Sequence, residues 1–461
     1  MNVFEKPIPL QFHRQMQNTI SLPRSNYNRL IATGIMPSKL AFGAKLVDAK
    51  VIPHDSSNGS CKLAYHLAKD LSIPFEANVR LFADEHVLHI GPLIGIFTAG
   101  FTSSRQRPVG DRSLMFAQYL STALKTGGYV FIFGSHVIDW ENGIISGYMY
   151  TQNGWQQHDI PFPHVVYDRI PNRKAEQLPM LQKIKKRMQT NYRIPWFNSG
   201  FFNKWTIYKK LSENSDVRHY LPKTAVNPTA ETVEAMLEDY RHVYMKPADG
   251  SLGAGICHII KREKDGLYYC RYLDDRKTVI KRYASLPTLF DQHFPSEKRT
   301  QFIVQQGISL LKINSRPVDF RIHTNKNLQG EWQISAIAAK ISGSNRLTTH
   351  LANGGSVKTI DELLKDSPSI QPDIKNLQNT TLMLSQALEE KLDGFHGEFG
   401  FDMGIDINGR IWMFEANSKP GRSIFKHPDL KEFDLLTRKL SLEFGIFLAE
   451  KAITEPEELF K

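Results

Sequence analysis

The alternation of apolar and polar positions changes along the chain, and its first pattern covers residues 1 to about 88. Short candidate strands there, such as KLAFGAKLVDAKVI and ANVRLFADEHVLHI, are separated by turn residues. Short strands at close spacing are typical of a small β domain. We therefore expect an N-terminal, mostly-β domain over residues 1–88.

A second pattern begins at residues 91–101, GPLIGIFTAGF, where an apolar strand runs into a glycine-containing turn. Apolar residues at helical spacing follow, namely Leu114, Ala117, Leu120 and Leu124. Two more apolar strands are predicted at 127–135 and 159–169. Strands that are apolar throughout and alternate with helices indicate a parallel sheet covered by helices. The pattern predicts a small parallel α/β domain over residues 89–200.

The third pattern, from residue 201 onward, mixes the helical and strand periods. Helices are predicted at 203–212, 229–240, 372–393 and 430–451. Strands are predicted at 242–247, 255–260, 267–273, 300–308, 318–325 and 331–341. Thr229 stands directly before the second of these helices and is its predicted N-cap. The whole chain is therefore expected to be of the α/β (α+β) class.

A hairpin is predicted within residues 397–421, which read GEFGFDMGIDINGRIWMFEANSKPG. Asn408-Gly409 predicts a two-residue type I′ turn, because that turn needs positive φ at both positions. Centring the hairpin on this turn gives the pairs Ile407–Arg410, Ile405–Trp412 and Asp402–Glu415. The alternation places two sets on opposite faces, Ile411, Met413, Glu415 and Asn417 against Trp412, Phe414 and Ala416.

The predicted pairing of Asp402 with Glu415 sets two carboxylates directly opposite each other. Like charges at that distance repel, and burial without a partner adds a desolvation cost. A divalent cation such as Mg²⁺ removes both costs, and Asn417 can supply a third oxygen. We expect a magnesium clamp at these three residues. The alternative is a solvated hairpin with acidic edges.

Residues 243–256, VYMKPADGSLGAGI, combine a strand that delivers Lys246 with a loop rich in glycine. Glycines let the backbone approach an anion closely, and successive N–H groups can form a nest for it. The loop lacks the Gly-Lys-Ser/Thr signature of the Walker pattern. It indicates a phosphate-binding site, and a tight β-hairpin without a ligand is the alternative.

Residues 301–308, QFIVQQGI, form a strand that turns into a linker. Such a segment offers an adenine ring a flat apolar slot together with backbone donors and acceptors. Shortly afterwards, Asp319 and Arg321 are expected on one face of a strand. The Asp can bond ribose hydroxyls, and the Arg can hold a phosphate or an acyl-phosphate. A salt bridge within the sheet is the alternative.

The charge balance indicates the kind of partner. The 461 residues carry 58 Lys or Arg against 47 Asp or Glu, which gives a net charge of +11. Such a balance favours anionic partners, among them a nucleotide or an acidic substrate. Residues 169–210 contain eleven Lys or Arg and one acid, Glu176. This stretch is either a solvated basic face or a site that recruits an acidic peptide or protein tail.

Several protein classes receive no support from the sequence. It contains no run of about 18 apolar residues that would predict a membrane span, and its N-terminus lacks the apolar core of a signal peptide. Three scattered cysteines, Cys61, Cys257 and Cys270, show neither metal-binding spacing nor a disulfide framework. Nucleic-acid binding would rest on charge alone and is not expected. We expect a protein of the reducing cytoplasm.

Several motifs together resemble the ATP-grasp superfamily over about residues 91–450: Lys204, Lys246 with DGSLGAGI, QFIVQQGI, VDFR and the FDMGIDINGRIWMFEANSKPG hairpin. A narrower resemblance, to the YheC/YheD group of endospore coat-associated proteins, rests on GPLIGIFTAGF, the basic segment before PWFNSGFFNKW, and FEANSKPGRSIF. The resemblance implies an ATP-grasp domain over 201–461. Its parts would be a lid subdomain at about 215–306 and a metal-binding subdomain at about 307–461.

The resemblance also implies roles for single residues in binding ATP. Those implied to contact its phosphates are Lys204 and Lys246. Those implied to form the flexible loop over the phosphates are Gly250, Ser251 and Gly253. The adenine would lie against Gln305, Gln306 and Ile308. Asp319 would hold the ribose.

The remaining implied roles concern the metal and the chemistry. One or two Mg²⁺ ions would be bound by Asp402, Glu415 and Asn417. Arg321 and Lys340 would face the γ-phosphate or the reacting carboxylate. In the implied reaction ATP phosphorylates a carboxylate, and an amine then attacks the acyl-phosphate. Cations aimed at the developing negative charge lower the barrier to both steps.

The chain departs from the superfamily pattern at several positions. Amides stand at 305–306, where the adenine linker usually carries Glu. Gly400 stands where the D-alanine ligase-like pattern has an Arg, so Arg321 or Lys340 must replace it, or catalysis is weak. In HLANGG, His350 takes the place of an Asn of peptide-extending ligases. It is expected either to bind substrate or phosphate or to be solvated.

Three hypotheses of function remain from the sequence. The first is an ATP-dependent carboxylate–amine ligase that acts during sporulation. The second is a structural spore-coat or cortex protein whose ATP-grasp fold has lost activity. The third is a kinase of the same fold, which would release ADP with a stable phosphorylated product. The group's name implies the mother cell or forespore, with association with the spore coat.

Overall fold

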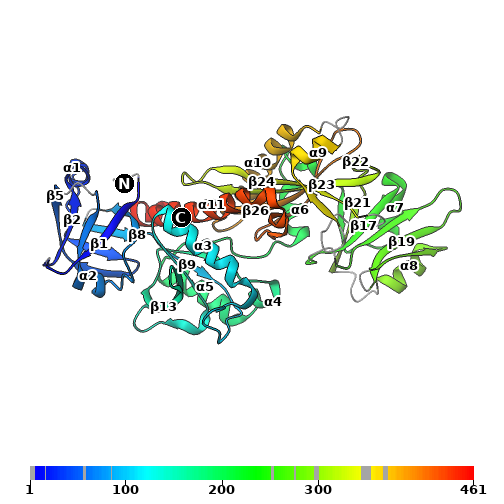
Figure 1. Cartoon of the computed structure of the whole chain (residues 1–461). Coiled ribbons are helices and arrows are strands. Elements are labelled where there is room, and N and C mark those ends of the chain that lie inside the picture. The colour runs from blue at the N-terminus through cyan, green and yellow to red at the C-terminus, as the bar shows by residue number, and fades with distance from the viewer. Residues whose placement is uncertain are drawn as a thin grey trace.

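The computed structural model describes residues 6–15, 17–55, 59–84, 86–250, 254–274, 277–294, 301–343, 355–366 and 372–460. Within these ranges the chain forms four β-sheets in succession, each accompanied by helices. Figure 1 shows an elongated molecule with the first sheet at one end and the sheet that contains β17, β19 and β21 at the other. The predicted mixed α/β class is confirmed.

The N-terminal sheet has eight strands in the order β4-β3-β8-β7-β1-β6-β2-β5. Its strands are β1 (Ile8–His13), β2 (Thr19–Pro23), β3 (Lys39–Phe42), β4 (Lys45–Asp48), β5 (Lys50–His54), β6 (Cys61–Ala64), β7 (Asn78–Ala83) and β8 (Val87–Gly91). Its helices are α1 (Arg24–Ala32) and α2 (Tyr65–Asp70). In β1, Ile8 and Leu10 are buried while Pro9 and Gln11 are exposed, so the period of two selects the face that packs.

The second sheet is built around parallel strands, as the sequence predicts. Its strands are β9 (Leu93–Phe97), β10 (Tyr129–Phe133), β11 (Ile138–Asp139), β12 (Ile144–Thr151), β13 (Gly154–Pro161), β14 (Val165–Asp168) and β15 (Trp196–Phe197). Its helices are α3 (Ser113–Thr126), α4 (Arg173–Glu176) and α5 (Pro179–Asn191). β9 pairs in parallel with β10 and with β14, and all three strands are buried at every position.

The single strand predicted at 159–169 is wrong. β13 ends at Pro161 and pairs antiparallel with β12, whereas β14 begins at Val165 and pairs in parallel with β9. Pro161 and Pro163 lack the N–H group that a continuous ladder needs. The apolar run therefore contains the end of a hairpin and the start of a core strand.

The central sheet is antiparallel, in the order β16-β21-β17-β18-β19-β20. Its strands are β16 (Thr224–Val226), β17 (His242–Pro247), β18 (Cys257–Lys261), β19 (Tyr268–Asp274), β20 (Lys277–Tyr283) and β21 (Phe302–Gln306). Helices α7 (Ala230–Tyr240) and α8 (Leu286–His293) pack on one of its faces. The predicted N-cap is confirmed, because Thr229 Oγ1 accepts from the Thr232 N–H at 3.2 Å. β20 and α8 were not predicted from the sequence.

The C-terminal sheet has the order β25-β24-β23-β26-β27, with β22 paired to β23. Its strands are β22 (Lys312–Ile313), β23 (Arg316–Lys326), β24 (Trp332–Ile341), β25 (Ser356–Lys358), β26 (Glu398–Ile405) and β27 (Ile411–Asn417). Helices α6 (Lys204–Ser212), α9 (Ile360–Asp366) and α10 (Ile374–Lys391) accompany it. Val318, Phe320, Phe399 and Phe401 pack with Leu384 of α10 in its core.

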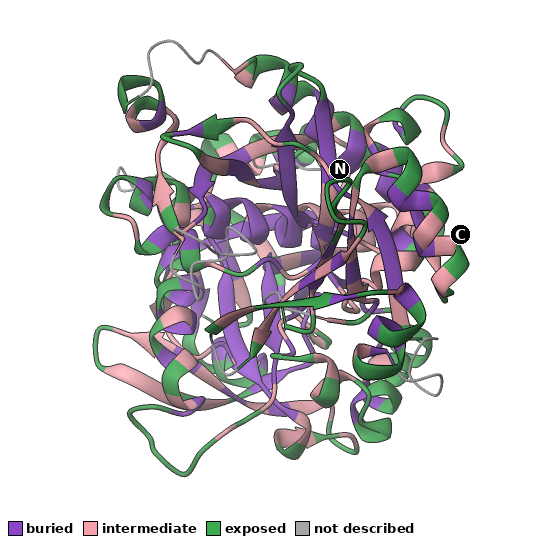
Figure 2. Ribbon diagram, turned by 90° about the vertical axis from the view of Figure 1, so that its right-hand side faces the viewer, coloured by how far each residue is buried: buried purple, intermediate pink, exposed green. Residues whose placement is uncertain are grey.

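The long helix α11 (Lys431–Thr454) connects several parts of the molecule, and α12 (Pro456–Leu459) follows it. It contacts β23 and β24 of the C-terminal sheet, α3 and β14 of the second sheet, and β7 of the N-terminal sheet. Figure 1 shows it in red between these sheets. Figure 2 shows buried residues concentrated in the strands and on the inner sides of the helices. Short 3₁₀ turns lie at Gly110–Arg112, Ser135–Val137, Arg218–Tyr220, Ser423–Lys426 and Pro428–Leu430.

The turn of the β26–β27 hairpin differs from the predicted type I′ turn. Gly409 has a φ of +82°, whereas Asn408 does not have a positive φ, and the Gly409 N–H donates to Asp406 O at 3.0 Å. This geometry is a type I turn followed by a glycine bulge. It pairs Ile405 with Ile411 rather than with Trp412.

A second irregularity restores the predicted pairing further along the hairpin. The register shifts between Asp402 and Met403, where Phe414 is the extra residue on β27. Asp402 therefore does pair with Glu415, as predicted. The shift also places Ile411, Met413 and Ala416 in the core, so the predicted division of β27 into two faces is wrong for these three residues.

Among the described residues, the structure contains no helix with the length and apolar character needed to cross a membrane.

Candidate functional site

A cavity of about 490 Å³ lies between the central sheet and the C-terminal sheet, and we call it the inter-sheet cavity. Its size is in the range of small-molecule sites. The sequence-predicted site residues on its walls are Lys246, Gln305, Gln306, Ile308, Asp319, Lys340, Asp402 and Glu415. Lys204 lines a smaller adjoining pocket with Lys246, Gln305 and Glu415. Ser251, Gly253 and His350 lie outside the described residues.

The acidic pair predicted to hold a metal faces cations in the structure. Asp402 lies 2.7 Å from Lys340 and 3.2 Å from Arg321, measured between nitrogen and oxygen. Glu415 lies 3.3 Å from Lys204. These ion pairs offset the repulsion between the two carboxylates, so the pairing of Asp402 with Glu415 is stable without a bound cation.

The donor set nevertheless fits a hard divalent cation. Asp402 and Glu415 are paired across β26 and β27, and Asn417 pairs with Gly400 on the same face. Two carboxylates and one amide oxygen are the ligand types that Mg²⁺ prefers. Asp402 and Glu415 also lie at the wall of the inter-sheet cavity.

Lys340 lies at the centre of a buried charge cluster. Its Nζ is 3.0 Å from Asp319 and 2.7 Å from Asp402. Burial would lower the pKa of Lys340, but attraction to these two carboxylates outweighs it and raises the pKa above its usual value. The positive charge of Arg321 acts against this rise and lowers the pKa of Lys340. Lys340 therefore stays cationic at neutral pH.

The salt bridge that the sequence offered as an alternative for Asp319 and Arg321 exists, but not between these two residues. Asp319 pairs with Lys340 of β24, and Arg321 pairs with Asp402 of β26. Both side chains leave β23 on the face opposite Val318 and Phe320, which are in the core. The predicted common face of Asp319 and Arg321 is confirmed.

The two lysines predicted to contact phosphates are held by polar groups of the central sheet. Lys204 begins α6, and its Nζ donates to Gly250 O at 2.5 Å. The side chain of Lys246 reaches the same cavity, and its Nζ donates to Gln305 Oε1 at 2.5 Å. Burial lowers the pKa of Lys246 to about 8, with Glu415 opposing this shift and Lys204 adding to it. Lys246 is therefore easier to deprotonate than an ordinary lysine.

The amides at 305–306 have partners in the central sheet. Gln305 Nε2 donates to Thr224 Oγ1 at 3.2 Å, while its Oε1 accepts from Lys246. Gln306 Oε1 accepts from the Lys223 N–H at 3.1 Å. A glutamate at 305 would offer only acceptors at neutral pH. The glutamine donates to Thr224 and accepts from Lys246 at once, which accounts for the amide at this position.

The outer wall of the cavity contains aromatic side chains that sequence analysis missed. Tyr244 stacks on His258 with ring centroids 4.5 Å apart and planes 14° from parallel. His242 Nδ1 and His258 Nε2 lie 2.9 Å apart. Burial, together with the neighbouring His242, lowers the pKa of His258 to about 3, so that it is neutral. Because His242 and Tyr244 share a face of β17 with Lys246, the period of two could have identified them.

A second cavity, of about 390 Å³, opens at the carboxyl ends of β9 and β10. It is lined by residues 98–102 and 134–136. Arg112 fixes this edge by donating to Thr98 Oγ1 at 2.8 Å. The carboxyl ends of parallel strands are a common place for ligands in α/β sheets. The sequence indicated the strands but not this cavity.

The basic stretch 169–210 does not form one solvated face. Arg169 is buried against Glu398 of β26, with 2.6 Å between nitrogen and oxygen. Arg173 donates to the Phe201 carbonyl at 3.2 Å. Other basic residues of the stretch are exposed on α5. The stretch thus divides into one buried anchor between sheets, Arg169, a half-buried Arg173 and a solvated remainder.

Gly400 lies where an arginine cannot be accommodated without movement of the backbone. A Cβ atom at this position would lie 2.4 Å from Pro420 Cβ. It would also lie 3.4 Å from Arg321 Nη1. The guanidinium of Arg321 therefore lies beside Gly400, the position at which the D-alanine ligase-like pattern has an arginine.

The comparisons with known proteins agree with this architecture. Residues 193–448, more than half of the chain, match the family model for the YheC/D-like ATP-grasp domain. The chain belongs to this family. It is 43% identical over 445 residues to the endospore coat-associated protein YheD of Bacillus subtilis (strain 168), with 96% of each chain covered. The predicted membership in the YheC/YheD group is therefore confirmed.

A further YheC/D-like relative and two solved structures are also similar. The endospore coat-associated protein YheC of Bacillus subtilis (strain 168) is 26% identical over 297 residues, which cover 62% of this chain and 79% of YheC. D-cycloserine synthetase DcsG matches with a TM-score of 0.44 and 11% identity, over 76% of this chain and 99% of its own. D-alanyl-alanine synthetase A from Vibrio cholerae matches with a TM-score of 0.42 and 12% identity, over 77% of this chain and 99% of its own.

Proposed function

We propose that the chain is an ATP- and Mg²⁺-dependent carboxylate–amine ligase that works through an acyl-phosphate. The observation that carries this proposal is the pairing of Asp402 with Glu415 beside Lys204, Lys246 and Lys340. These groups surround a cavity between two sheets in a member of the YheC/D-like ATP-grasp family. Anionic oxygens of a nucleotide and cations of the protein are complementary there.

ATP is proposed to bind in the inter-sheet cavity. Its phosphates would meet Lys204 and Lys246. The adenine would lie against residues 305–308, and Asp319 would accept hydrogen bonds from the ribose. Asp402, Glu415 and Asn417 of β26 and β27 would hold Mg²⁺. The ion would supply Lewis-acid neutralisation of the charge on the phosphate oxygens.

The first chemical step is attack by a carboxylate oxygen of the acid substrate on the γ-phosphorus of ATP. The bond from that phosphorus to the bridging oxygen breaks, and ADP leaves with the electron pair. The second step is attack by an amine on the acyl carbon, which expels inorganic phosphate. The amine loses a proton, so amide, ADP and phosphate are the products.

Arg321 and Lys340 are proposed to stabilise the charge that develops during both steps. Lys340 is held cationic between Asp319 and Asp402. Arg321 occupies the space beside Gly400, close to the metal-binding carboxylates. Cations that are positioned in advance lower the barrier without reorganisation during the reaction. This arrangement supports an active ligase despite the glycine at 400.

The acid and amine substrates are proposed to enter from the edge of the second sheet. The cavity at residues 98–102 and 134–136 lies at the carboxyl ends of β9 and β10. Arg169 of the same sheet reaches Glu398 at the start of β26, which leads to the metal clamp. An acidic peptide or protein tail fits the net charge of the chain. The names of the two Bacillus relatives support association with the spore coat.

Calorimetric titration with ATP and Mg²⁺ tests the nucleotide part of this proposal. The wild-type chain should bind ATP in a magnesium-dependent manner, and Glu415→Ala should lose the magnesium dependence. Glu432→Ala serves as the control, because Glu432 is exposed on α11. Absence of ATP binding by the wild-type chain would contradict both the ligase and the kinase hypotheses.

Product analysis separates the ligase from its alternatives. Acids and amines are screened in pairs for release of ADP, and products are identified by mass spectrometry. A ligase gives inorganic phosphate and an amide only when acid and amine are both present. A kinase gives ADP with a stable phosphorylated product. ATP binding without turnover by any pair would support a structural coat protein that retains its nucleotide site.

A further inference from the structure

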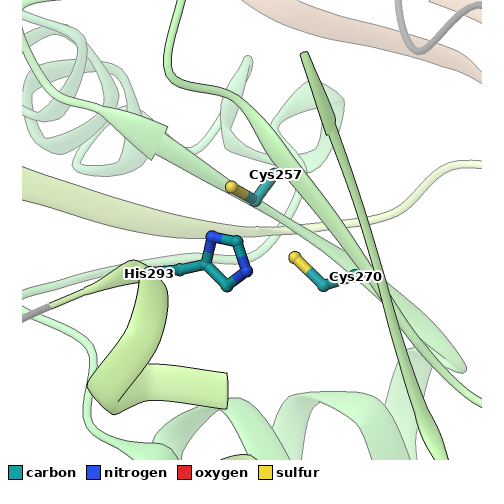
Figure 3. Close-up of side chains that lie close together, drawn as sticks. All are labelled: Cys257, Cys270 and His293. Atoms are coloured by element: carbon teal, nitrogen blue, oxygen red, sulfur yellow. The ribbon is translucent and has the colours of Figure 1, made fainter. Parts of the chain in front are cut away.

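Two cysteines and a histidine meet in the interior of the central sheet region. Cys257 comes from β18, Cys270 from β19, and His293 from the last position of α8. One ligand atom from each residue lies within 4.8 Å of the other two. Figure 3 shows the Cys270 sulfur pointing toward the imidazole ring and the Cys257 sulfur near the same ring. The spacing of the cysteines in the sequence gives no sign of this cluster, because a hairpin and a helix bring its members together.

The cluster is separate from the inter-sheet cavity. Tyr244, His258 and Arg271 project from the central sheet into that cavity. Cys257 and Cys270 project from the other face and pack in the core beneath α7 and α8. Their side chains are almost inaccessible, since the residues are 6% and 0% exposed. A ligand of this cluster would therefore not compete with a nucleotide.

The histidine is oriented by a further side chain. His293 Nε2 lies 2.7 Å from Tyr283 Oη, within hydrogen-bond distance. With Nε2 held by Tyr283, a metal would be ligated by Nδ1. Metal-binding histidines commonly use their second ring nitrogen in such a hydrogen bond, which fixes the tautomer and the ring. The ring of Tyr272 packs edge-on against His293, with centroids 4.6 Å apart.

A disulfide explains the two cysteines less well than a metal does. Cys257 pairs with Tyr272, and Ile259 pairs with Cys270, so the two cysteines are diagonal neighbours. Diagonal positions on an antiparallel pair have Cα atoms roughly 7–8 Å apart, beyond the usual limit of about 6.8 Å for a disulfide. Metal–sulfur bonds of about 2.3 Å from each side span a larger gap.

We propose that Cys257, Cys270 and His293 bind one zinc ion. Two thiolates and one imidazole are a known zinc ligand set, and a fourth position remains for a further ligand. The ion would join the β18–β19 hairpin to the end of α8. Bonds to three separate elements would restrain their relative positions.

Metal content measured on the full chain tests the site directly. The purified chain is stripped with a chelator, reloaded with zinc and analysed for bound metal. We expect one zinc per wild-type chain, and loss of this zinc in Cys257→Ser and in Cys270→Ser. Cys61→Ser is the matched control, because Cys61 is a buried cysteine of β6 in the N-terminal sheet. It should retain the zinc.

Spectroscopy keeps the test decisive if the cysteine variants fold poorly. Cobalt in place of zinc in the wild-type chain should give a thiolate-to-metal charge-transfer band and the intense visible bands of tetrahedral cobalt. Tyr283→Phe removes the hydrogen bond to His293 and the one that Tyr283 Oη donates to Gln292 Oε1 at 3.1 Å. It should weaken zinc binding by about 10–100-fold. It should leave one site per chain.

Four outcomes would overturn the zinc site. The first is a wild-type chain that binds no stoichiometric zinc. The second is a cobalt spectrum without thiolate bands. The third is zinc retained in full by both Cys257→Ser and Cys270→Ser. A disulfide between Cys257 and Cys270, found by peptide mass analysis of the untreated protein, would also exclude the metal site.

Discussion

At the level of single residues, the acidic groups of the site are matched by cations from different elements. Lys204 begins α6, Arg321 lies in β23 and Lys340 lies in β24. They face Glu415 and Asp402 at distances of 3.3 Å or less. Such buried pairs contribute little net stability when intact, but loss of one partner leaves an uncompensated charge. The cluster is therefore sensitive to substitutions of one member.

Replacement of Lys340 by methionine should strongly destabilise the chain. Asp319 and Asp402 would lose their shared cation and repel each other in a buried position. Loss of one partner of a buried pair costs about 3–5 kcal/mol. Thermal unfolding should show a clear drop in the midpoint for Lys340→Met and no drop for Lys431→Met, since Lys431 is exposed. Equal midpoints for the two variants would contradict the buried charge cluster.

The lowered pKa of Lys246 predicts a pH dependence of ATP binding. Burial brings this pKa to about 8, so the ammonium form predominates below that pH and is lost as the pH rises through it. If phosphate binding needs the ammonium, affinity should fall by up to about tenfold per pH unit above the pKa. Lys246→Arg stays charged over this range and should show a flatter profile. Titration calorimetry at a series of pH values measures the ATP affinity of the wild-type chain and of Lys246→Arg.

At the level of secondary-structure elements, the β26–β27 hairpin shows how two local deviations compensate. The turn after Asp406 adds one residue to the loop, and the extra Phe414 adds another to β27. Each alone would shift the register by one residue and turn every following side chain to the other face. Together they return Glu415 to its place opposite Asp402. The prediction of this pair was confirmed although the predicted turn was wrong.

The glycine in this turn should be required for its backbone conformation. Gly409 has a φ of +82°, and a Cβ atom at this position would have no other atom within 4 Å. Gly409→Ala therefore tests backbone strain alone. The strain of an L-residue there is about 1–2 kcal/mol. Gly421→Ala is the control, with equally open space but no positive φ. Thermal unfolding should show a lower midpoint for Gly409→Ala only, and similar midpoints would contradict the bulged turn.

At the level of the whole molecule, α11 joins sheets that lie far apart in the sequence. Leu442, Phe444, Ile446 and Leu448 of this helix pack in one cluster with Ile94, Ile96 and Phe116 of the second sheet region. The Phe444 ring meets Phe197 edge-on, with centroids 5.3 Å apart. A Cβ atom at Gly397 would lie 2.2 Å from the Phe444 ring. The position of β26 relative to the second sheet therefore depends on this close contact.

Truncation of Phe444 should weaken the connection between the sheets. Loss of a buried phenylalanine side chain costs about 3–5 kcal/mol. Phe444→Ala should lower the thermal midpoint and increase hydrogen exchange in β14 and β26. Phe433→Ala on the same helix is the control, because Phe433 is 39% exposed. Comparable effects of the two variants would contradict a connecting role for the buried face of α11.

Local sequence pattern was enough to predict several helices and the residues that share a strand face. It predicted α6, α7, α10 and α11 closely, and it set Asp319 beside Arg321 and Asp402 opposite Glu415, because local spacing decides these relations. It missed α8 and β20, because eight and seven residues span too few periods to be told from a loop.

The tertiary structure alone decided which residues from distant segments meet. The partners of Asp402, the aromatic wall around His258 and the cluster of Cys257, Cys270 and His293 come from separate strands and helices. Periodicity fixes the direction in which a side chain leaves its own helix or strand. It does not fix which residue of another element that side chain contacts. Packing of whole sheets and helices fixes that neighbour, since apolar faces must be covered together.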